Sequence, residues 1–83
     1  MKQLSCKFEK LGQFQPLIYT KQAGGVFTVH YQNAYVKHRS MLTAAYGSGE
    51  TKEKALANYK QKLRACLLIF NPDESNRKEV WVL

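Results

Sequence analysis

Hydrophobic and polar residues alternate along several short segments of this chain, which is typical of half-buried β-strands. The clearest segment is Val26–Tyr31, where five of the six residues are β-branched or aromatic. Ala23-Gly24-Gly25 separates it from Leu17–Thr20, and this glycine-rich spacer predicts a hairpin. After a turn at Gln32–Ala34, the largely apolar stretch Arg39–Tyr46 predicts a third strand. The three strands together indicate an antiparallel meander.

A helical period follows the meander. Gly47-Ser48-Gly49 predicts a turn, and Thr51 is a candidate N-cap because its hydroxyl can accept an N–H of the first helical turn. The next apolar residues form a stripe along one side of a helix, made of Leu56, Tyr59, Leu63 and Cys66. Leu68 and Ile69 do not continue the stripe, so we expect the helix to end near residue 65.

The two ends of the chain complete the predicted sheet. Leu67–Phe70 and Lys78–Leu83 indicate strands, and Asn71–Asn76 has strong turn chemistry. Residues 1–12 fit either a strand or a helix, with a preference for a strand. The predicted fold is therefore α+β: a single antiparallel sheet covered on one face by one helix, in the order β-β-β-α-β-β. We expect a single domain over residues 1–83.

The net charge of +7 is unevenly distributed. Excess positive charge attracts polyanions, and solubility alone is the alternative explanation for it. Residues 1–49 hold six bases but only one acid, Glu9. Basic and aromatic side chains gather on Tyr35–Arg39, with His30 and Tyr31 expected nearby across the sheet, and such groups can hold phosphates and stack on bases. The alternative interpretation of this segment is a solvated hairpin. The predicted nucleic-acid-binding residues are Tyr35, Lys37, His38 and Arg39, together with Lys52 and Lys54 at the start of the helix.

The sequence has few residue patterns typical of catalytic or metal-binding sites. The six acids show no pairing typical of a two-metal site, and no nucleophile can be assigned to His30. The two cysteines and two histidines match no zinc spacing. We therefore predict a protein that is not an enzyme and needs no cofactor or metal. Cys6 and Cys66 are predicted to be buried free thiols, with a single disulfide in a secreted domain as the alternative.

The sequence also favours a cytoplasmic location. It has no apolar run near the roughly 20 residues that span a bilayer, and residues 1–8 have no apolar core of a secretory signal. We expect no membrane contact.

The meander that enters the helix through Gly49–Asn58 resembles HicB-like domains, in which a βββ meander enters a helix through a Gly-Asp-Thr-x-x-Glu-Ala pattern. Gly24–Val29 fits the earlier hairpin, and the resemblance covers about residues 17–64. Lys54 stands where the family has glutamate, no DNA-binding helical motif follows, and the chain is basic where HicB antitoxins tend to be acidic.

The end of the chain, from Leu68 to Val80, looks like that of small phage and prophage proteins of unknown function. These resemblances imply a non-catalytic phage or prophage accessory protein that associates with nucleic acid. The alternative is a protein-binding regulator of the antitoxin kind, with a protein partner or a second copy on the uncovered sheet face.

A weaker resemblance is to double-stranded RNA-binding domains. The matching residues are Pro16, Tyr19, Phe27-Thr28-Val29, Gly47, Gly49, Thr51, Lys52 and Ala55. Glu53 and Leu56 replace lysines of that pattern, and the histidine-bearing loop between the first two strands is missing. This resemblance implies, as a further alternative, a degenerate domain that grips duplex RNA through its phosphates.

Overall fold

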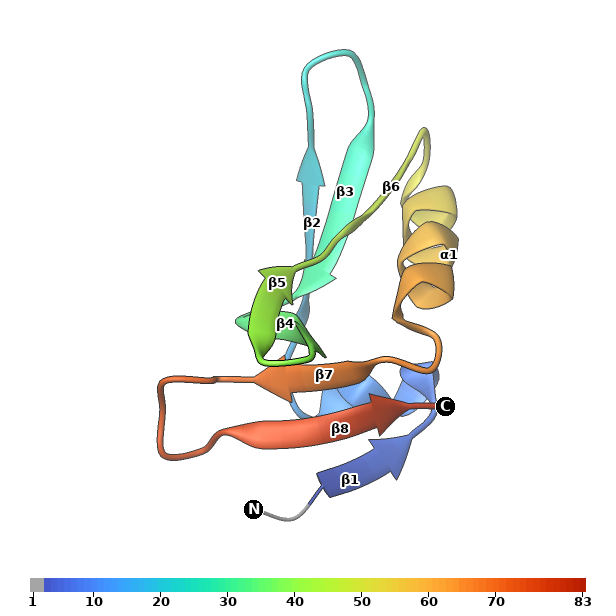
Figure 1. Cartoon of the computed structure of the whole chain (residues 1–83). Coiled ribbons are helices and arrows are strands. Elements are labelled where there is room, and N and C mark those ends of the chain that lie inside the picture. Colours follow the sequence, from blue (N-terminus) through green and yellow to red (C-terminus); the bar gives the residue numbers. More distant parts are fainter. Residues whose placement is uncertain (1–2) are drawn as a thin grey trace.

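Two β-sheets and one α-helix make up the computed structural model, which describes residues 3–83 (Figure 1). The larger sheet has the strand order β1-β8-β7-β4-β5 and the smaller one β2-β3-β6. The larger sheet consists of β1 (Gln3–Cys6), β8 (Lys78–Val82), β7 (Leu67–Phe70), β4 (Ala34–His38) and β5 (Met41–Ala44). The smaller sheet consists of β2 (Leu17–Lys21), β3 (Phe27–Tyr31) and β6 (Gly47–Gly49). The helix α1 spans Lys52–Leu63, and a 3-10 helix, η1, spans Phe8–Gln13.

The predicted single antiparallel sheet with the order β-β-β-α-β-β is wrong. The strands form two sheets, and β1 pairs with β8 in parallel, so the larger sheet is mixed. The predicted third strand, Arg39–Tyr46, contains β5, which pairs with β4, a strand that was not predicted. The predicted turn at Gly47-Ser48-Gly49 is wrong, because these residues form β6, which pairs with β3 in the smaller sheet. The predicted hairpin between β2 and β3 is confirmed.

A corner at Gln32 and Asn33 explains why one sheet becomes two. Asn33 has φ 52° and forms two hydrogen bonds with Asn71: its Nδ2 donates to Asn71 Oδ1 at 3.0 Å, and its backbone carbonyl accepts from Asn71 N at 2.9 Å. Gln15 Nε2 donates to Gln32 O at 2.8 Å. Asparagine adopts this left-handed conformation more readily than most residues. The corner turns β4 away from β3. Because β5 pairs with β4 and β6 pairs with β3, the chain passes from the larger sheet to the smaller one between Ala44 and Gly47.

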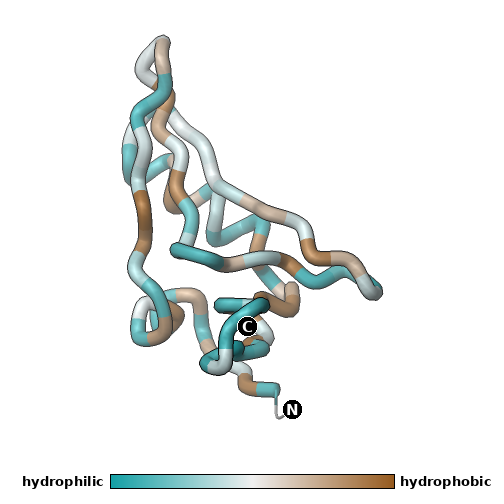
Figure 2. The backbone as a smooth tube through the Cα atoms, turned by 90° about the vertical axis from the view of Figure 1, so that its left-hand side faces the viewer, coloured by the Kyte–Doolittle hydropathy of each residue, from teal (hydrophilic) through white to brown (hydrophobic). Residues whose placement is uncertain are grey.

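The helix and the strand after it follow the sequence closely. Thr51 Oγ1 accepts a hydrogen bond from Lys54 N at 3.1 Å, which confirms the N-cap. The helix ends at Leu63, near the predicted end, and β7 is extended and buried throughout, as predicted. Seen from the left-hand side of Figure 1, hydrophobic and hydrophilic residues alternate along much of the chain (Figure 2), as half-buried strands require.

An aromatic cluster joins η1, β3 and α1 in the core. Tyr31 N donates to Tyr59 Oη at 3.0 Å, and Tyr31 Oη donates to Phe8 O at 3.2 Å. Burial raises the pKa of Tyr31 to about 12. Val29 is buried in the same core, so this face of β3 points toward the helix and needs no other partner.

The sequence did not decide whether residues 1–12 form a strand or a helix. Within the described part of this segment, the structure has a strand followed by the start of η1.

The two cysteines lie on either side of β8. Cys6 is the register partner of Val82, and Val82 N donates to Cys66 O at 2.9 Å. Two interstrand spacings of about 4.8 Å therefore separate them, more than a disulfide allows. Both are free thiols, as predicted, but the expected full burial is wrong, since both are only half-buried. Partial burial still raises the pKa of Cys6. No helix within residues 3–83 is long and apolar enough to cross a membrane.

Candidate nucleic-acid interface

The β4–β5 hairpin carries three consecutive basic residues, Lys37, His38 and Arg39, which we call the basic turn. His38 pairs with Met41, so Arg39 and Ser40 form a two-residue connection. His38 and Arg39 are exposed, and Lys37 is half-buried. The short connection and the paired strands constrain the backbone that carries these side chains.

Arg39 occupies a backbone conformation that few residues adopt. Its φ is 59°, in the left-handed region where a β-carbon is disfavoured by about 1–2 kcal/mol. Two-residue hairpin turns usually place glycine, asparagine or aspartate in this conformation. Strained positions of this kind are often found at functional sites, and Arg39 is therefore a candidate for direct contact with a ligand.

The basic turn lies in a stretch of sequence without acids, and Glu79 of β8 is a nearby carboxylate from outside that stretch. Hydrogen bonds from Gln3 and Arg77 lower the pKa of Glu79, and the charge of Lys37 lowers it further. No acid occurs between Glu9 and Glu50, a stretch that includes every strand from β2 to β6. Elsewhere, three acids are paired with bases: Glu9 with Lys60 at 2.9 Å, Glu50 with Lys54 at 3.8 Å, and Glu79 with Arg77 at 3.2 Å. Lys37 and Arg39 take part in none of the ion pairs found among residues 3–83.

The structure separates the predicted site residues into two groups. Lys52 and Lys54 lie in the first turn of α1, at the end of the helix that points away from the five-stranded sheet (Figure 1). Lys52 Nζ lies 5.5 Å from the centroid of the Tyr19 ring, and Lys54 pairs with Glu50. These two lysines therefore do not join Tyr35, Lys37, His38 and Arg39 in one site.

A cleft of about 650 Å³ lies on the side of the small sheet that faces away from α1. Side chains of β2 and β3 alternate between the two faces of the small sheet. Val29 faces the core, and the side chains on the other face line the cleft. Residues of β4, β5 and the following connection close its other side. The lining includes Thr20, Thr28, His30, Tyr35, Ala44 and Tyr46.

The cleft partly confirms the expected neighbours of Tyr35. His30 lines the same cleft, as expected, and its Nδ1 lies 2.9 Å from the carbonyl oxygen of Tyr31. Because a carbonyl only accepts, Nδ1 carries a proton and Nε2 of the neutral ring remains an acceptor. Tyr31 was also expected at this surface, but this prediction is wrong, because its side chain belongs to the core.

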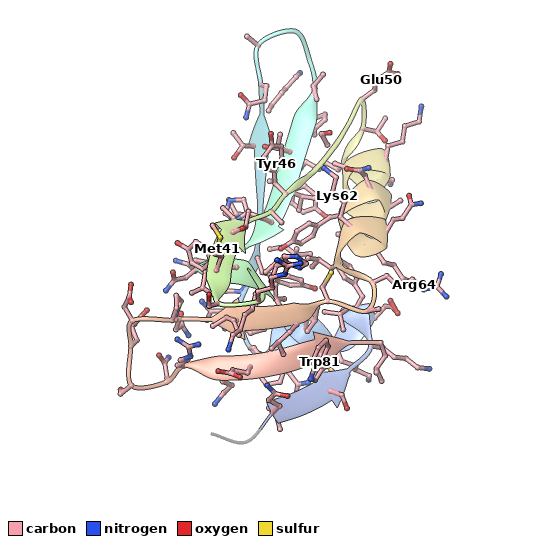
Figure 3. All side chains as sticks on the ribbon, viewed as in Figure 1. Met41, Tyr46, Glu50, Lys62, Arg64 and Trp81 are labelled. Carbon is pink, nitrogen blue, oxygen red and sulfur yellow. The ribbon has the colours of Figure 1, made fainter. Side chains whose placement is uncertain are left out.

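Tyr46 and Lys62 are further candidate residues that the sequence did not reveal. Tyr46 is 54% exposed, and Lys62 Nζ lies 5.5 Å from the centroid of its ring and donates to its carbonyl oxygen at 3.2 Å. The two residues lie next to each other where the β5–β6 segment passes α1 (Figure 3). A tyrosine just before a glycine turn was the only signal in the sequence for this contact.

Trp81, on β8, is another residue near Lys37 that was not identified from the sequence. The cross-strand register places Lys37, Leu67 and Trp81 in one row on the outer face of the larger sheet. Trp81 Nε1 donates to Gln3 Oε1 at 2.9 Å, and hydrogen bonds from Gln3 and Arg77 hold the pKa of Glu79 below its usual range. This row depends on pairing between distant strands, which the sequence pattern did not predict.

The chemistry available at this surface is binding chemistry. Its cations can hold phosphates, its tyrosine rings can stack on planar groups, and its threonine and histidine side chains can form hydrogen bonds. Within residues 3–83, no group of three or more histidine, cysteine, aspartate or glutamate side chains could hold a metal ion.

Comparison with protein-family models finds no match, and neither a curated protein nor a solved structure shows significant similarity to this chain.

Proposed function

We propose that this protein is a non-catalytic accessory domain that binds nucleic acid through the β4–β5 hairpin. The observation that carries the proposal is the acid-free stretch between Glu9 and Glu50, which bears Lys37, His38 and Arg39 on a closed turn. Cations on an exposed hairpin, outside the ion pairs of the described residues, attract phosphates. The resemblance to small phage and prophage proteins fits an accessory role, and the HicB-like and RNA-binding-domain resemblances stay predictions.

The expected binding is weak and mainly electrostatic, with a dissociation constant in the micromolar range or above, because no element presents a convincing reader of base-pair edges. Fluorescence anisotropy with labelled single-stranded DNA, duplex DNA and duplex RNA, measured over a series of salt concentrations, tests this. We expect affinity to fall as salt rises. Absence of binding to all three at low salt would contradict the proposal.

The double substitution Lys37→Gln/Arg39→Gln tests the hairpin as the site. Loss of two phosphate contacts should weaken binding and reduce the salt slope on a single strand by about 1.4. The matched control is Lys7→Gln/Lys10→Gln, which removes the same charge from the segment at η1, behind β7 and β8 in Figure 1. Equal effects of the two double substitutions would mean that net charge, not the hairpin, drives binding.

A second candidate function is protein binding at the edge strand β5. All four of its residues, Met41–Ala44, are exposed, and none is charged or proline, so the usual protection of an edge strand is missing. Sedimentation velocity tests the simplest partner, a second copy. Salt-insensitive self-association that is lost in Leu42→Lys would favour this function over nucleic-acid binding.

A further inference from the structure

We infer that the cleft beside the basic turn takes an unpaired base, so that the protein prefers single-stranded over duplex nucleic acid. The inference rests on the proposed function and adds what it leaves open, which is the form of the nucleic acid. The basic turn alone would hold any phosphate backbone, whereas the cleft offers contacts that only an unstacked base can use.

The first step of the argument is the position of Tyr35. Tyr35 and Lys37 are two residues apart on β4, so their side chains leave the same face of the sheet. Tyr35 lines the cleft and is half-buried, while Lys37 lies nearer the tip of the hairpin. A strand whose phosphates lie on the basic turn therefore has a cleft with an aromatic wall within reach of its next bases.

Tyr46 supplies a second aromatic ring from the connection between β5 and β6. Lys62 lies over its ring but is not among the residues that line the cleft, so the cleft side of the ring stays free. The lysine holds the ring in place and adds positive charge beside the cleft (Figure 3). The cleft thus has two tyrosine rings, one beneath Lys62 and one on the same strand face as Lys37, which is the combination of stacking and charge that single-strand binding uses.

The polar groups of the cleft suit the edge of a base. His30 Nε2 can accept an N–H, and the hydroxyls of Thr20 and Thr28 can donate or accept. None of the described residues that line the cleft is acidic. Glu74 does not line the cleft, but its carboxylate accepts a hydrogen bond at 2.8 Å from Asn33, which does. The volume of about 650 Å³ lies within the usual range of ligand sites, roughly 300–1,000 Å³.

A comparison of two oligonucleotides separates base contacts from phosphate contacts. The probes are a labelled twelve-nucleotide oligo-dT and an abasic strand with the same number of phosphates. Stacking in the cleft should make oligo-dT bind at least about fivefold more tightly than the abasic strand. A self-complementary duplex of the same length should bind no better than the abasic strand, and an oligo-rU arm shows whether the ribose matters.

Tyr46→Leu and Tyr35→Leu identify the cleft as the source of this difference. Each should remove most of the preference for oligo-dT while leaving the affinity for the abasic strand within about twofold. Tyr46 is largely exposed, so its replacement should not disturb folding even where that of Tyr35 does. The matched control is Tyr19→Leu, since Tyr19 is also exposed beneath a lysine but lies on the other face of the small sheet.

Each outcome decides one question. Equal affinity of the native protein for oligo-dT and the abasic strand would overturn the inference and leave the proposed function standing. An unchanged preference in Tyr46→Leu, or an equal loss in Tyr19→Leu, would exclude the cleft as the base site. Absence of binding to either oligonucleotide at low salt would overturn both proposals.

Discussion

Two glycines allow β6 to approach the helix more closely than any other residue would. A β-carbon at Gly47 would lie 2.5 Å from Tyr59 Cβ and closer still to Ala55 O. A β-carbon at Gly49 would lie 2.6 Å from Ala55 N. Both contacts involve backbone atoms of α1, which cannot move aside as a flexible side chain could. The Gly-Ser-Gly segment, which the sequence predicted as a turn, is thus a strand that packs closely against α1 because its two glycines carry no β-carbon.

We expect Gly47→Ala to destabilise the protein by about 3 kcal/mol or more, because the new methyl group would have to displace the helix backbone. Urea unfolding followed by circular dichroism measures the change. Gly12→Ala is the matched control, since a β-carbon there meets nothing within 4 Å, and its effect should stay within about 0.5 kcal/mol. Similar effects for the two substitutions would show that the close approach of β6 to α1 is not required.

At the scale of single elements, α1 packs against the core through the apolar residues on one of its sides. Ala55, Tyr59 and Leu63 are buried, and the residues between them are more exposed. Leu63 is completely buried and belongs to the same core cluster as residues of β3, β7 and β8. The stripe predicted from the sequence is therefore largely confirmed, except that Cys66 lies beyond the end of the helix.

Leu63→Ala should lower the free energy of unfolding by about 2–4 kcal/mol, since it leaves a cavity where the helix meets both sheets. Leu83→Ala is a suitable comparison because Leu83 is 67% exposed, and it should change stability by less than about 0.5 kcal/mol. Both are measured by urea unfolding. A loss below about 0.5 kcal/mol for Leu63→Ala would contradict the packing of α1 described above.

Local elements could be predicted from the sequence, whereas their arrangement could not. The cap at Thr51, the helix end and the β2–β3 hairpin each depend on neighbouring residues, and patterns of a few residues predicted them. The division between β5 and β6 depends on Asn33 and Asn71, which are 38 positions apart and meet only in the folded chain. The parallel pairing of β1 with β8 joins the two ends of the chain and has no local signal.

For the molecule as a whole, charge and topology together define the candidate site. The sequence located the basic turn, because the cations are consecutive there. It could not show that Lys52 and Lys54 lie at the far end of the helix, nor that Tyr46 and His30 share a cleft with Tyr35, since these contacts are set by the angle between the sheets. The acid-free stretch supplies strands to both sheets, with β2, β3 and β6 in the smaller sheet and β4 and β5 in the larger one. The corner at Gln32 and Asn33 brings the two groups together, and residues from both line the cleft.

Arg39→Gly separates the stability of the hairpin from its binding function. Glycine adopts the φ of 59° without strain, so the free energy of unfolding should stay the same or rise by up to about 1 kcal/mol. Loss of the guanidinium should nevertheless weaken binding to oligo-dT at low salt by at least about twofold. Ser40→Gly is the control within the same turn. Ser40 has no positive φ, so glycine there should cost roughly 0.5 kcal/mol of stability and leave binding unchanged. If Arg39→Gly instead destabilised the protein and kept full affinity, the arginine would serve the fold, and the basic turn would lose its role as the binding site.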